Sequence, residues 1–366
     1  MKKIKKLVLM LAAAGVIGLF AGCDTSSSSG GGGPETPEQP ATGGKIAKKA
    51  IVINGVTFDK TAEVYATETA VTITGSNDYS EIFIEGRNVT LSPFIMGKYE
   101  VTQELYKAVM KDQKVTVDGT EYTLAAEPSY CSDASTTYVI TEGETQKYRP
   151  VEGVTWYDAV YFCNVLSEKL NLTEAYVIEV TTVNSEGHIT AGTVTPVAKA
   201  NGYRLPTEAE WEFAARGGDS SKADWNYLFS GAARAEGTGY SSSKNTGLDS
   251  VGWYRYNLAN GTTSDATIAS GTAGYGTHEV GKKAANALGL YDMSGNVSEC
   301  CYDWYITSLD TDDVTDPTGA SWGVFRVSRG GSWSTGASSA NVYDRGYLNP
   351  YDRLSYHGFR VCRSAN

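Results

Sequence analysis

Only three stretches of this chain combine helical periodicity with a helix start signal, and they limit the folds open to it. QELYKAVM follows Thr102, WYDAVYFCNVLSEKL follows Thr155 and EAEWEFAAR follows Thr207. A Thr at such a place accepts hydrogen bonds from the first helical turn, and an acid three residues later completes a capping box at Thr155 and Thr207. The chain also holds 40 glycines among 366 residues, and beyond Gly218 its pattern indicates irregular structure with short strands. We therefore expect a loop-rich α+β fold and not a helical bundle.

Short strands are expected on both sides of these helices. Apolar and partly alternating runs predict them at residues 50–53, 71–73, 81–92, 326–333 and 359–363. The more polar regions 112–148 and 172–200 are interpreted as excursions between the helices. Large core fillers are expected at Trp156, Trp211, Trp304, Trp322 and Trp333. A buried ion-pair network is expected between Arg204 and one of the acids of the third helix, Glu208, Glu210 or Glu212.

The N-terminus is typical of a bacterial lipoprotein. A start with four lysines precedes an apolar run at residues 7–20, which suits a secretory signal better than a membrane span of roughly 20 residues. Small residues precede Cys23 as in a lipobox, so we expect residues 1–22 to be a signal peptide and Cys23 to carry the lipid. The alternative is a plain secretory peptide in which this cysteine is incidental. Residues 23–44 are rich in Ser, Gly and Pro and are expected to form a flexible tether. Residues 45–366 contain no second linker and are expected to form one domain.

Charge and motif content exclude several function classes. The net charge is −11, and without the four signal-peptide lysines it becomes 27 − 42 = −15, which repels phosphate backbones and argues against nucleic acid as a partner. The three histidines, His188, His278 and His357, are too far apart in sequence to compose a zinc motif. The sequence shows no P-loop and no Ser-His-Asp order.

A tyrosine-rich segment, residues 334–357, stands out near the C-terminus. Its sequence STGASSANVYDRGYLNPYDRLSYH holds four of the 24 tyrosines of the chain, together with Ser, Gly, Asp and Asn. Tyrosine supplies large contact area at low entropic cost, and the small polar residues adapt around it, as in antibody paratopes. The composition favours ligand binding over an ordinary surface loop.

Six motifs occur in one order and together resemble the formylglycine-generating-enzyme (sulfatase-modifying-factor) family. They are MGKYEVTQ at 96–103, PVEGVTWYDAVYFCN at 150–164, NGYRLPTEAEWEFAARGG at 201–218, NALGLYDMSGNVSE at 286–299, SRGGSW at 328–333 and GFRV at 358–361. The resemblance covers the chain from about residue 45 to its end. It implies the C-type-lectin fold of that family, an α+β fold whose loops present a site near the C-terminus.

The same resemblance argues against the chemistry of the family. Its oxidase uses two cysteines shortly after the GGS phrase, and the resemblance places Thr335 and Ala340 at those positions. Neither side chain can form a thiolate, so we expect no enzyme of this kind. The sulfoxide-synthase branch needs a three-histidine iron site and a separate helical domain, which this chain lacks. The resemblance further implies a disulfide between Cys163 and Cys362, with free buried cysteines as the alternative.

The end of the chain also resembles the variable regions of diversity-generating retroelement proteins. Such elements mutate adenines, and from Asn codons these changes never yield Lys, Glu, Gln, Met or Trp, all of which are missing from the tyrosine-rich segment. The frame of the pattern is matched by Trp333, Arg345, Asn349-Pro350, Arg353 and Gly358-Phe359-Arg360. The exposed contact positions that this resemblance predicts are Ser334, Thr335, Gly336, Tyr343, Asp344, Gly346, Tyr347, Leu348, Tyr351, Asp352, Leu354, Ser355, Tyr356 and His357.

The family resemblance also implies a structural calcium site. Asp292 and Glu299 would supply carboxylates, and Gly295 and Val297 backbone carbonyls, which suits a hard cation. The alternative at these residues is a hydrogen-bonded turn without metal. No cofactor is required by either interpretation.

These observations lead to one preferred interpretation and two alternatives. The preferred one is a lipid-anchored protein of the bacterial cell envelope, on the outer-membrane surface, whose retroelement-diversified segment binds a protein or another macromolecule. Its contact with the membrane is expected through the lipid on Cys23. The alternatives are a divergent enzyme of the formylglycine-generating family and a structural envelope lipoprotein.

Overall fold

The computed structural model describes residues 44–76, 82–233, 245–259 and 267–365, which fall within one compact unit, Ala41–Asn366. The signal peptide expected at residues 1–22, the lipidated Cys23 and the tether up to residue 43 lie outside the described residues. Within the described part of the chain, no helix is long and apolar enough to cross a bilayer.

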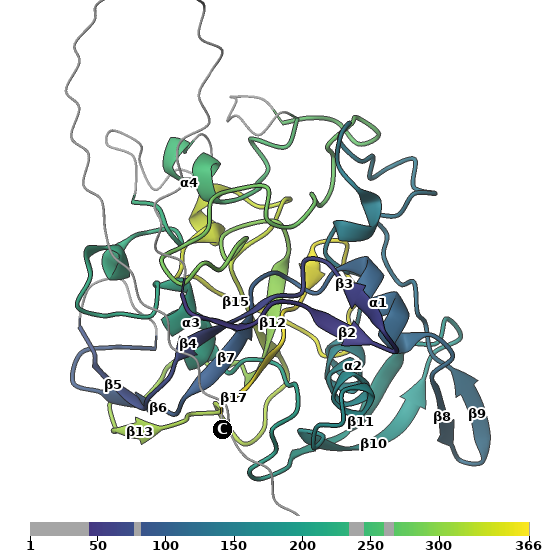
Figure 1. Cartoon of the computed structure of the whole chain (residues 1–366), viewed down its shortest axis with the longest axis horizontal. Helices are drawn as coiled ribbons and strands as arrows, with labels where there is room; N and C mark the ends of the chain where they lie inside the picture. The colour runs from purple at the N-terminus through teal and green to yellow at the C-terminus, as the bar shows by residue number, and fades with distance from the viewer. Residues whose placement is uncertain (1–43, 77–81, 234–244, 260–266, 366) are drawn as a thin grey trace, which may run out of the picture. The chain divides into compact units, whose positions relative to one another are not determined.

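The three predicted helices are confirmed, and each begins directly after its threonine cap (Figure 1). Around α2, the Thr155 hydroxyl accepts the N–H of Asp158 while the Asp158 carboxylate accepts the N–H of Thr155, which closes a capping box. Gly217 follows the third helix with a φ of +85°, a left-handed conformation that favours glycine at a helix end. The helices of the described residues are α1 Gln103–Met110, α2 Trp156–Lys169, α3 Glu208–Ala215 and the short α4 Thr246–Val251, with 3₁₀ turns η1 Gln146–Tyr148, η2 Ala223–Asn226 and η3 Ala337–Ala340.

Short strands form small sheets among the loops (Figure 1). The first four-stranded sheet has the order β1-β4-β7-β17, with strands Ile46–Lys48, Glu63–Thr67, Phe94–Gly97 and Cys362–Ser364. The second has the order β15-β14-β12-β16, with strands Arg345–Leu348, Arg326–Arg329, Ser298–Trp304 and His357–Gly358. A three-stranded sheet has the order β13-β6-β5, with strands Val314–Thr315, Asn88–Leu91 and Val71–Thr74. The tyrosine-rich segment contributes β15 and the first residue of β16, so the second sheet holds it at its middle and at its C-terminal end.

Two regions interpreted as polar excursions contain regular hairpins instead. Within residues 172–200, β10 Tyr176–Val183 pairs antiparallel with β11 Ile189–Pro196, and this hairpin lies against α2 (Figure 1). Within residues 112–148, β8 Lys114–Val117 pairs with β9 Thr120–Thr123. The remaining hairpin joins β2 Ile51–Ile53 to β3 Val56–Phe58. The excursions look polar because one face of each ladder is open to water, which is common in antiparallel sheets.

Three other predicted strands are shorter than expected. The stretch 81–92 forms a strand only at Asn88–Leu91, and 326–333 only at Arg326–Arg329, after which Gly330 and Gly331 take positive φ. Between β16 and β17, residues 359–361 are not in a strand, so the predicted strand 359–363 is wrong for most of its length.

Aromatic side chains fill the core, as expected for a fold with few long strands. Trp156 of α2 lies in one apolar cluster with Phe162 and Phe359, and Trp211 of α3 lies in another with Phe94. Most residues of α2 are buried all round its axis, which is typical of a helix enclosed by other elements.

One expected core residue is on the surface. Trp322 has 78% of its area exposed, so the prediction that it fills the core is wrong. Trp304 is only half-buried, and its ring covers one face of the Arg326 guanidinium at 3.4 Å while Trp156 covers the same group at 3.6 Å. Stacking on a guanidinium gives these rings a role that pure packing would not predict.

Buried ion pairs connect the third helix to the rest of the unit. Arg204 makes two contacts of 2.6 Å with the Glu210 carboxylate, which confirms the predicted pairing with an acid of this helix. Glu212 is fully buried and bonds to Arg216 and Arg329. Because a buried charge without a partner costs several kcal/mol, these pairs fix the position of α3 against β14.

Candidate ligand-binding surface

The chain leaves the second sheet after β14, and the tyrosine-rich segment rejoins this sheet as β15 and again at β16. Its most exposed large side chains are Tyr347, with 56% of its area in water, and Tyr351, with 54%. Tyr343 and Tyr356 are half-buried, so none of the four tyrosines of the segment belongs to the core. The other partly exposed positions among the predicted contacts are Ser334, Thr335, Gly336, Asp344, Gly346, Asp352, Leu354 and Ser355.

Two of the predicted contact positions are buried and are therefore wrong. Leu348 is 3% exposed because alternate residues of a strand face opposite sides, and its neighbour Tyr347 takes the outer side of β15. His357 is 6% exposed because it pairs with Ser298 of β12 in a parallel ladder. Burial lowers the pKa of His357 to about 4, and its Nδ1 has no hydrogen-bond partner, so the ring is neutral at the buried C-terminal end of the segment.

Arginines of the expected frame anchor the segment at two points. The Arg345 guanidinium bonds both oxygens of Glu208, with Nε–Oε1 at 2.6 Å and Nη2–Oε2 at 2.8 Å, and its side chain is 7% exposed. Arg353 donates to the Gly153 carbonyl at 2.7 Å and contacts Glu186. Bidentate pairs of this kind fix orientation as well as distance, which makes the base of the segment stiff.

Further anchors bind the segment through its main-chain carbonyls. The Arg329 guanidinium donates to the Asp344 carbonyl at 2.6 Å, and the Trp333 indole N–H donates to the Ser355 carbonyl at 2.9 Å. Backbone N–H groups from outside the segment donate to the carbonyls of Thr335, Pro350, Leu354 and Tyr356. These contacts hold the path of the backbone without using the side chains of the predicted contact positions.

Two half-buried aromatic residues outside the segment adjoin it, and the sequence analysis did not assign them to a site. The Phe325 ring lies 4.8 Å from the ring of Tyr347, and Tyr305 lies 5.0 Å from it. Trp322 and Val324, 78% and 64% exposed, precede Phe325 in sequence. The signal that could have revealed Trp322 is its setting between Ser321 and Gly323, which offers no apolar periodicity to carry it inward.

The positions that bear the oxidase cysteines of the family carry no thiol here. The Thr335 hydroxyl accepts the N–H of Ser332 at 2.9 Å, and Ala340 is fully buried at the end of η3. The five described cysteines are buried and free, so the disulfide implied between Cys163 and Cys362 is not formed. Burial raises the pKa of the Cys131 and Cys300 thiols to about 12, and it raises those of the other three as well. Thiolate chemistry has no ready nucleophile among the described residues.

The residues of the implied calcium site lie in a buried carboxylate network. Both oxygens of Glu299 bond to Arg360, at 2.6 and 2.7 Å, and one also accepts the Trp211 indole N–H. Asp292 accepts the Gly281 N–H through Oδ2, while its buried Oδ1 has no partner. Among the described residues no group of three or more His, Cys, Asp or Glu side chains is arranged for a metal ion. The unpartnered Asp292 oxygen could ligate a cation, whereas both Glu299 oxygens already bond to Arg360. A complete calcium site at Asp292, Gly295, Val297 and Glu299 therefore stays a prediction.

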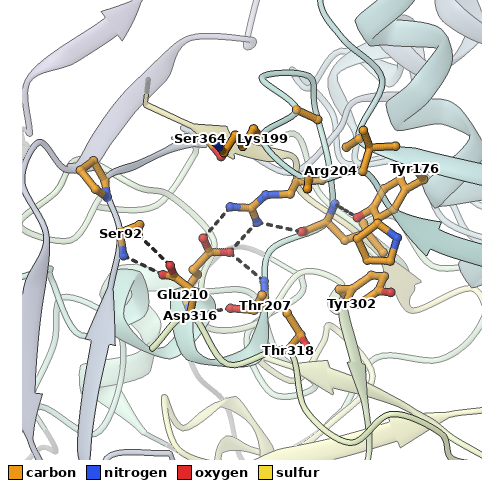
Figure 2. A pocket seen from close by; sticks show the side chains of 17 residues that line it. Ser92, Tyr176, Lys199, Arg204, Thr207, Glu210, Tyr302, Asp316, Thr318 and Ser364 are labelled. Atoms are coloured by element: carbon orange, nitrogen blue, oxygen red, sulfur yellow. Dashed lines mark hydrogen bonds and ion pairs between the residues drawn. The ribbon is translucent and has the colours of Figure 1, made fainter. Parts of the chain in front are cut away.

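A cavity of about 360 Å³ lies between the loop at 196–200 and the start of α3 (Figure 2). Figure 2 shows the Arg204 guanidinium directed at Glu210, and this is the ion pair described above. Glu210 also closes the capping box with Thr207, and the Tyr176 hydroxyl accepts the Leu205 N–H. Arg204 and Glu210 at this cavity are therefore engaged in holding α3, while Asp316 accepts hydrogen bonds from Ser92.

Comparison with known proteins places these features in a family. The family model described as a sulfatase-modifying factor enzyme 1-like domain matches residues 38–365. A chaperone protein LppX from Paenibacillus barcinonensis is 34% identical over 80% of this chain and 85% of its own length. A formylglycine-generating enzyme from Thermomonospora curvata is 27% identical over 75% of this chain and 83% of its own length.

Among solved structures, the Treponema denticola variable protein 1 is similar in both fold and sequence. It superimposes with a TM-score of 0.62 and 33% identity, over 87% of this chain and 99% of its own.

Proposed function

This chain belongs to the sulfatase-modifying factor enzyme 1-like family, which has the C-type-lectin fold of formylglycine-generating enzymes, and we propose that it is a non-catalytic ligand-binding member. In this proposal the tyrosine-rich segment is the contact surface, and the arginine-anchored sheet beneath it is the scaffold. A few exposed aromatic side chains, Tyr347 and Tyr351 first among them, supply most of the affinity.

One observation carries the proposal: the segment combines exposed tyrosines with a backbone held from below. Arg345 and Arg353 fix the base, while Tyr347 and Tyr351 keep more than half of their area in water. A rigid aromatic surface binds with a small loss of conformational entropy. A structural envelope protein would have no need for such a surface.

The residues at the oxidase positions support a non-catalytic protein. Thr335 and Ala340 replace the two cysteines, and the thiols present elsewhere in the described residues are buried with raised pKa values. The similarity to a chaperone LppX and to a variable protein points in the same direction. The formylglycine-generating enzymes are related at lower identity and supply the scaffold.

The proposal includes a place and a source of variation. Cleavage before Cys23 and lipid attachment would tether the domain to the bacterial envelope, with residues 23–44 as the spacer. Display on the outer-membrane surface would make a macromolecule outside the cell the ligand. A retroelement that mutates adenines would then change the contact positions from cell to cell.

A segment exchange tests the binding function. The full chain and a variant carrying a different retroelement-compatible sequence at ten of the twelve surface positions, with Thr335 and Gly346 kept for their backbone roles, would be compared on a panel of purified extracellular proteins. We expect the set of bound panel members to change while Tm moves by no more than about 2 °C, because these side chains contribute little to the fold. A Val177→Ala variant, which truncates an exposed side chain of β10, is the control that leaves the profile unchanged. An unchanged profile after the exchange, or a collapse of Tm, contradicts the proposal.

The diversification is tested separately by the DNA that flanks the gene. A reverse-transcriptase gene and a near-copy of the segment's coding sequence, differing at adenines, are expected there. If neither is present, diversification is refuted while ligand binding by the segment still stands.

A further inference from the structure

A second cavity, of about 460 Å³, lies beside the base of the tyrosine-rich segment. Its walls come from the end of β12, the start of α3 and the loop at residues 306–320, and Arg345 of the segment closes one side. We call it the Asp303 cavity after the buried carboxyl group that faces it.

Asp303 is the unusual group in this cavity. The residue is 4% exposed, and its Oδ2 accepts the Glu208 N–H at 2.9 Å. Among the described residues the Asp303 carboxyl group forms no salt bridge, and the charged groups nearest to it are Glu208, Glu210 and Arg326. By contrast, the neighbouring Glu208 is neutralised by Arg345 and Arg329. A buried carboxylate at a cavity wall without a cation is costly, and a cationic ligand would remove that cost.

The other walls suit the stem that carries such a cation. Trp304, Ile306, Leu309 and Pro317 provide apolar and aromatic surface next to Asp303. Aliphatic stems of lysine and arginine bury well against such surface while their charged ends stay paired. Asp310 and Asp316 add negative charge to the lining, and the guanidinium of Arg87 is turned to the carbonyls of residues 82 and 312.

We propose that the Asp303 cavity binds the cationic side chain, ammonium or guanidinium, of a lysine or arginine on a protein ligand. Asp303 takes the charge, and the apolar walls take the stem. Changes in the tyrosine-rich segment would leave the cavity lining the same, because every lining residue except Arg345 lies outside that segment. Its role in recognising a protein ligand rests on the proposed function, whereas its affinity for the cationic group does not.

The rings of Tyr305 and Tyr347 connect the cavity to the contact surface. The Arg345 guanidinium lies over the Tyr305 ring at 5.0 Å, and Tyr305 lies 5.0 Å from Tyr347. A ligand that touches Tyr347 could therefore place a basic side chain in the cavity. This arrangement would combine a constant anchor with variable contacts.

Two small probes test the cavity directly. Nα-acetyl-lysine amide would be titrated into the full chain by calorimetry, with Nα-acetyl-norleucine amide as the matched probe that lacks the ammonium group. We expect only the lysine probe to bind and Asp303→Asn to weaken it at least tenfold, while the asparagine still accepts the Glu208 N–H. Asp133→Asn, an exposed acid at a different cavity, controls for general attraction to a chain of net charge −11 and leaves the affinity unchanged.

The pH dependence in the unmodified chain gives a second readout that does not depend on the variant folding. Burial and the nearby charges of Glu208 and Glu210 raise the pKa of Asp303 to about 8. The hydrogen bond from the Glu208 N–H and the charge of Arg326 act in the opposite direction and lower it. Asp310, Asp316, Arg87 and Arg345 complete the charged lining. Since only the ionised carboxylate pairs with the cation, affinity for the lysine probe should rise about tenfold per pH unit below 8 and level off above it.

Each outcome decides something different. Equal binding of both probes, equal affinity in Asp303→Asn, or an affinity that does not change between pH 6 and 9 overturns the proposal. Calcium that binds and displaces the lysine probe only when Asp303 is intact would assign the cavity to a metal instead and also overturn it. A Tyr347→Ala variant should keep the probe affinity, so a failed segment exchange alongside intact probe binding refutes the proposed function and leaves the cavity standing.

Discussion

The buried His357 should make this protein lose stability in mild acid. Its pKa is about 4 in the folded chain against an ordinary value of 6.5, because burial penalises the charged ring. Between these values the unfolded chain binds a proton that the folded chain refuses, so the free energy of unfolding falls as the pH drops. The contribution is fully present above pH 6.5 and lost by about pH 4. A gap of about 2.5 units corresponds to about 3 kcal/mol.

Urea denaturation of the unmodified chain and of His357→Leu, measured from pH 7.5 to pH 4, isolates this effect. Leucine has a similar volume and cannot titrate, so every other ionising group cancels in the comparison. We expect the unmodified chain to lose about 3 kcal/mol more than the variant over this range. Parallel stability profiles for the two proteins would refute the neutral buried ring, and a steeper loss in the variant would refute the sign.

Two further predictions concern the scaffold. Glu299→Ala removes both contacts between the buried Arg360 guanidinium and the Glu299 carboxylate. The free energy of unfolding, measured in urea, should therefore fall by about 3–5 kcal/mol. A fall below about 1 kcal/mol would show that the pair is dispensable. Gly358→Ala would place a methyl group 2.5 Å from the Val151 carbonyl oxygen, a backbone atom with little freedom to move, so a loss of about 1–3 kcal/mol is expected in the same assay. An alanine there without effect on Tm would mean that β16 sits farther from Val151 than the structure shows.

The features that could be predicted from the sequence are those encoded within a few consecutive residues. The capping box of Thr155 and Asp158 is complete within one helical turn, and all three main helices begin where such signals place them. The frame arginines of the tyrosine-rich segment could be named because they match the frame of the variable-region pattern. Their partners could not, since Glu208 and Gly153 are distant in sequence and meet Arg345 and Arg353 only in the folded chain.

The misses have the same physical origin. The burial of Leu348 and His357 depends on pairing with β14 and β12, and composition alone made the whole segment look exposed. The sequence did not reveal the β10–β11 hairpin because the region is largely polar, although β-branched residues make up most of β10. Trp322 shows the reverse error, since a large aromatic residue does not by itself indicate the core.

The carbonyl anchors of the tyrosine-rich segment limit how this chain can vary over generations. Every amino acid carries a main-chain oxygen, so replacing the residue at Asp344 or Ser355 leaves the acceptor for Arg329 or Trp333 in place. Adding or deleting one residue would instead shift every later carbonyl along the chain, so it would no longer lie opposite its donor. If the segment is diversified as proposed, gene copies from different cells should differ in sequence and agree in length across residues 334–357.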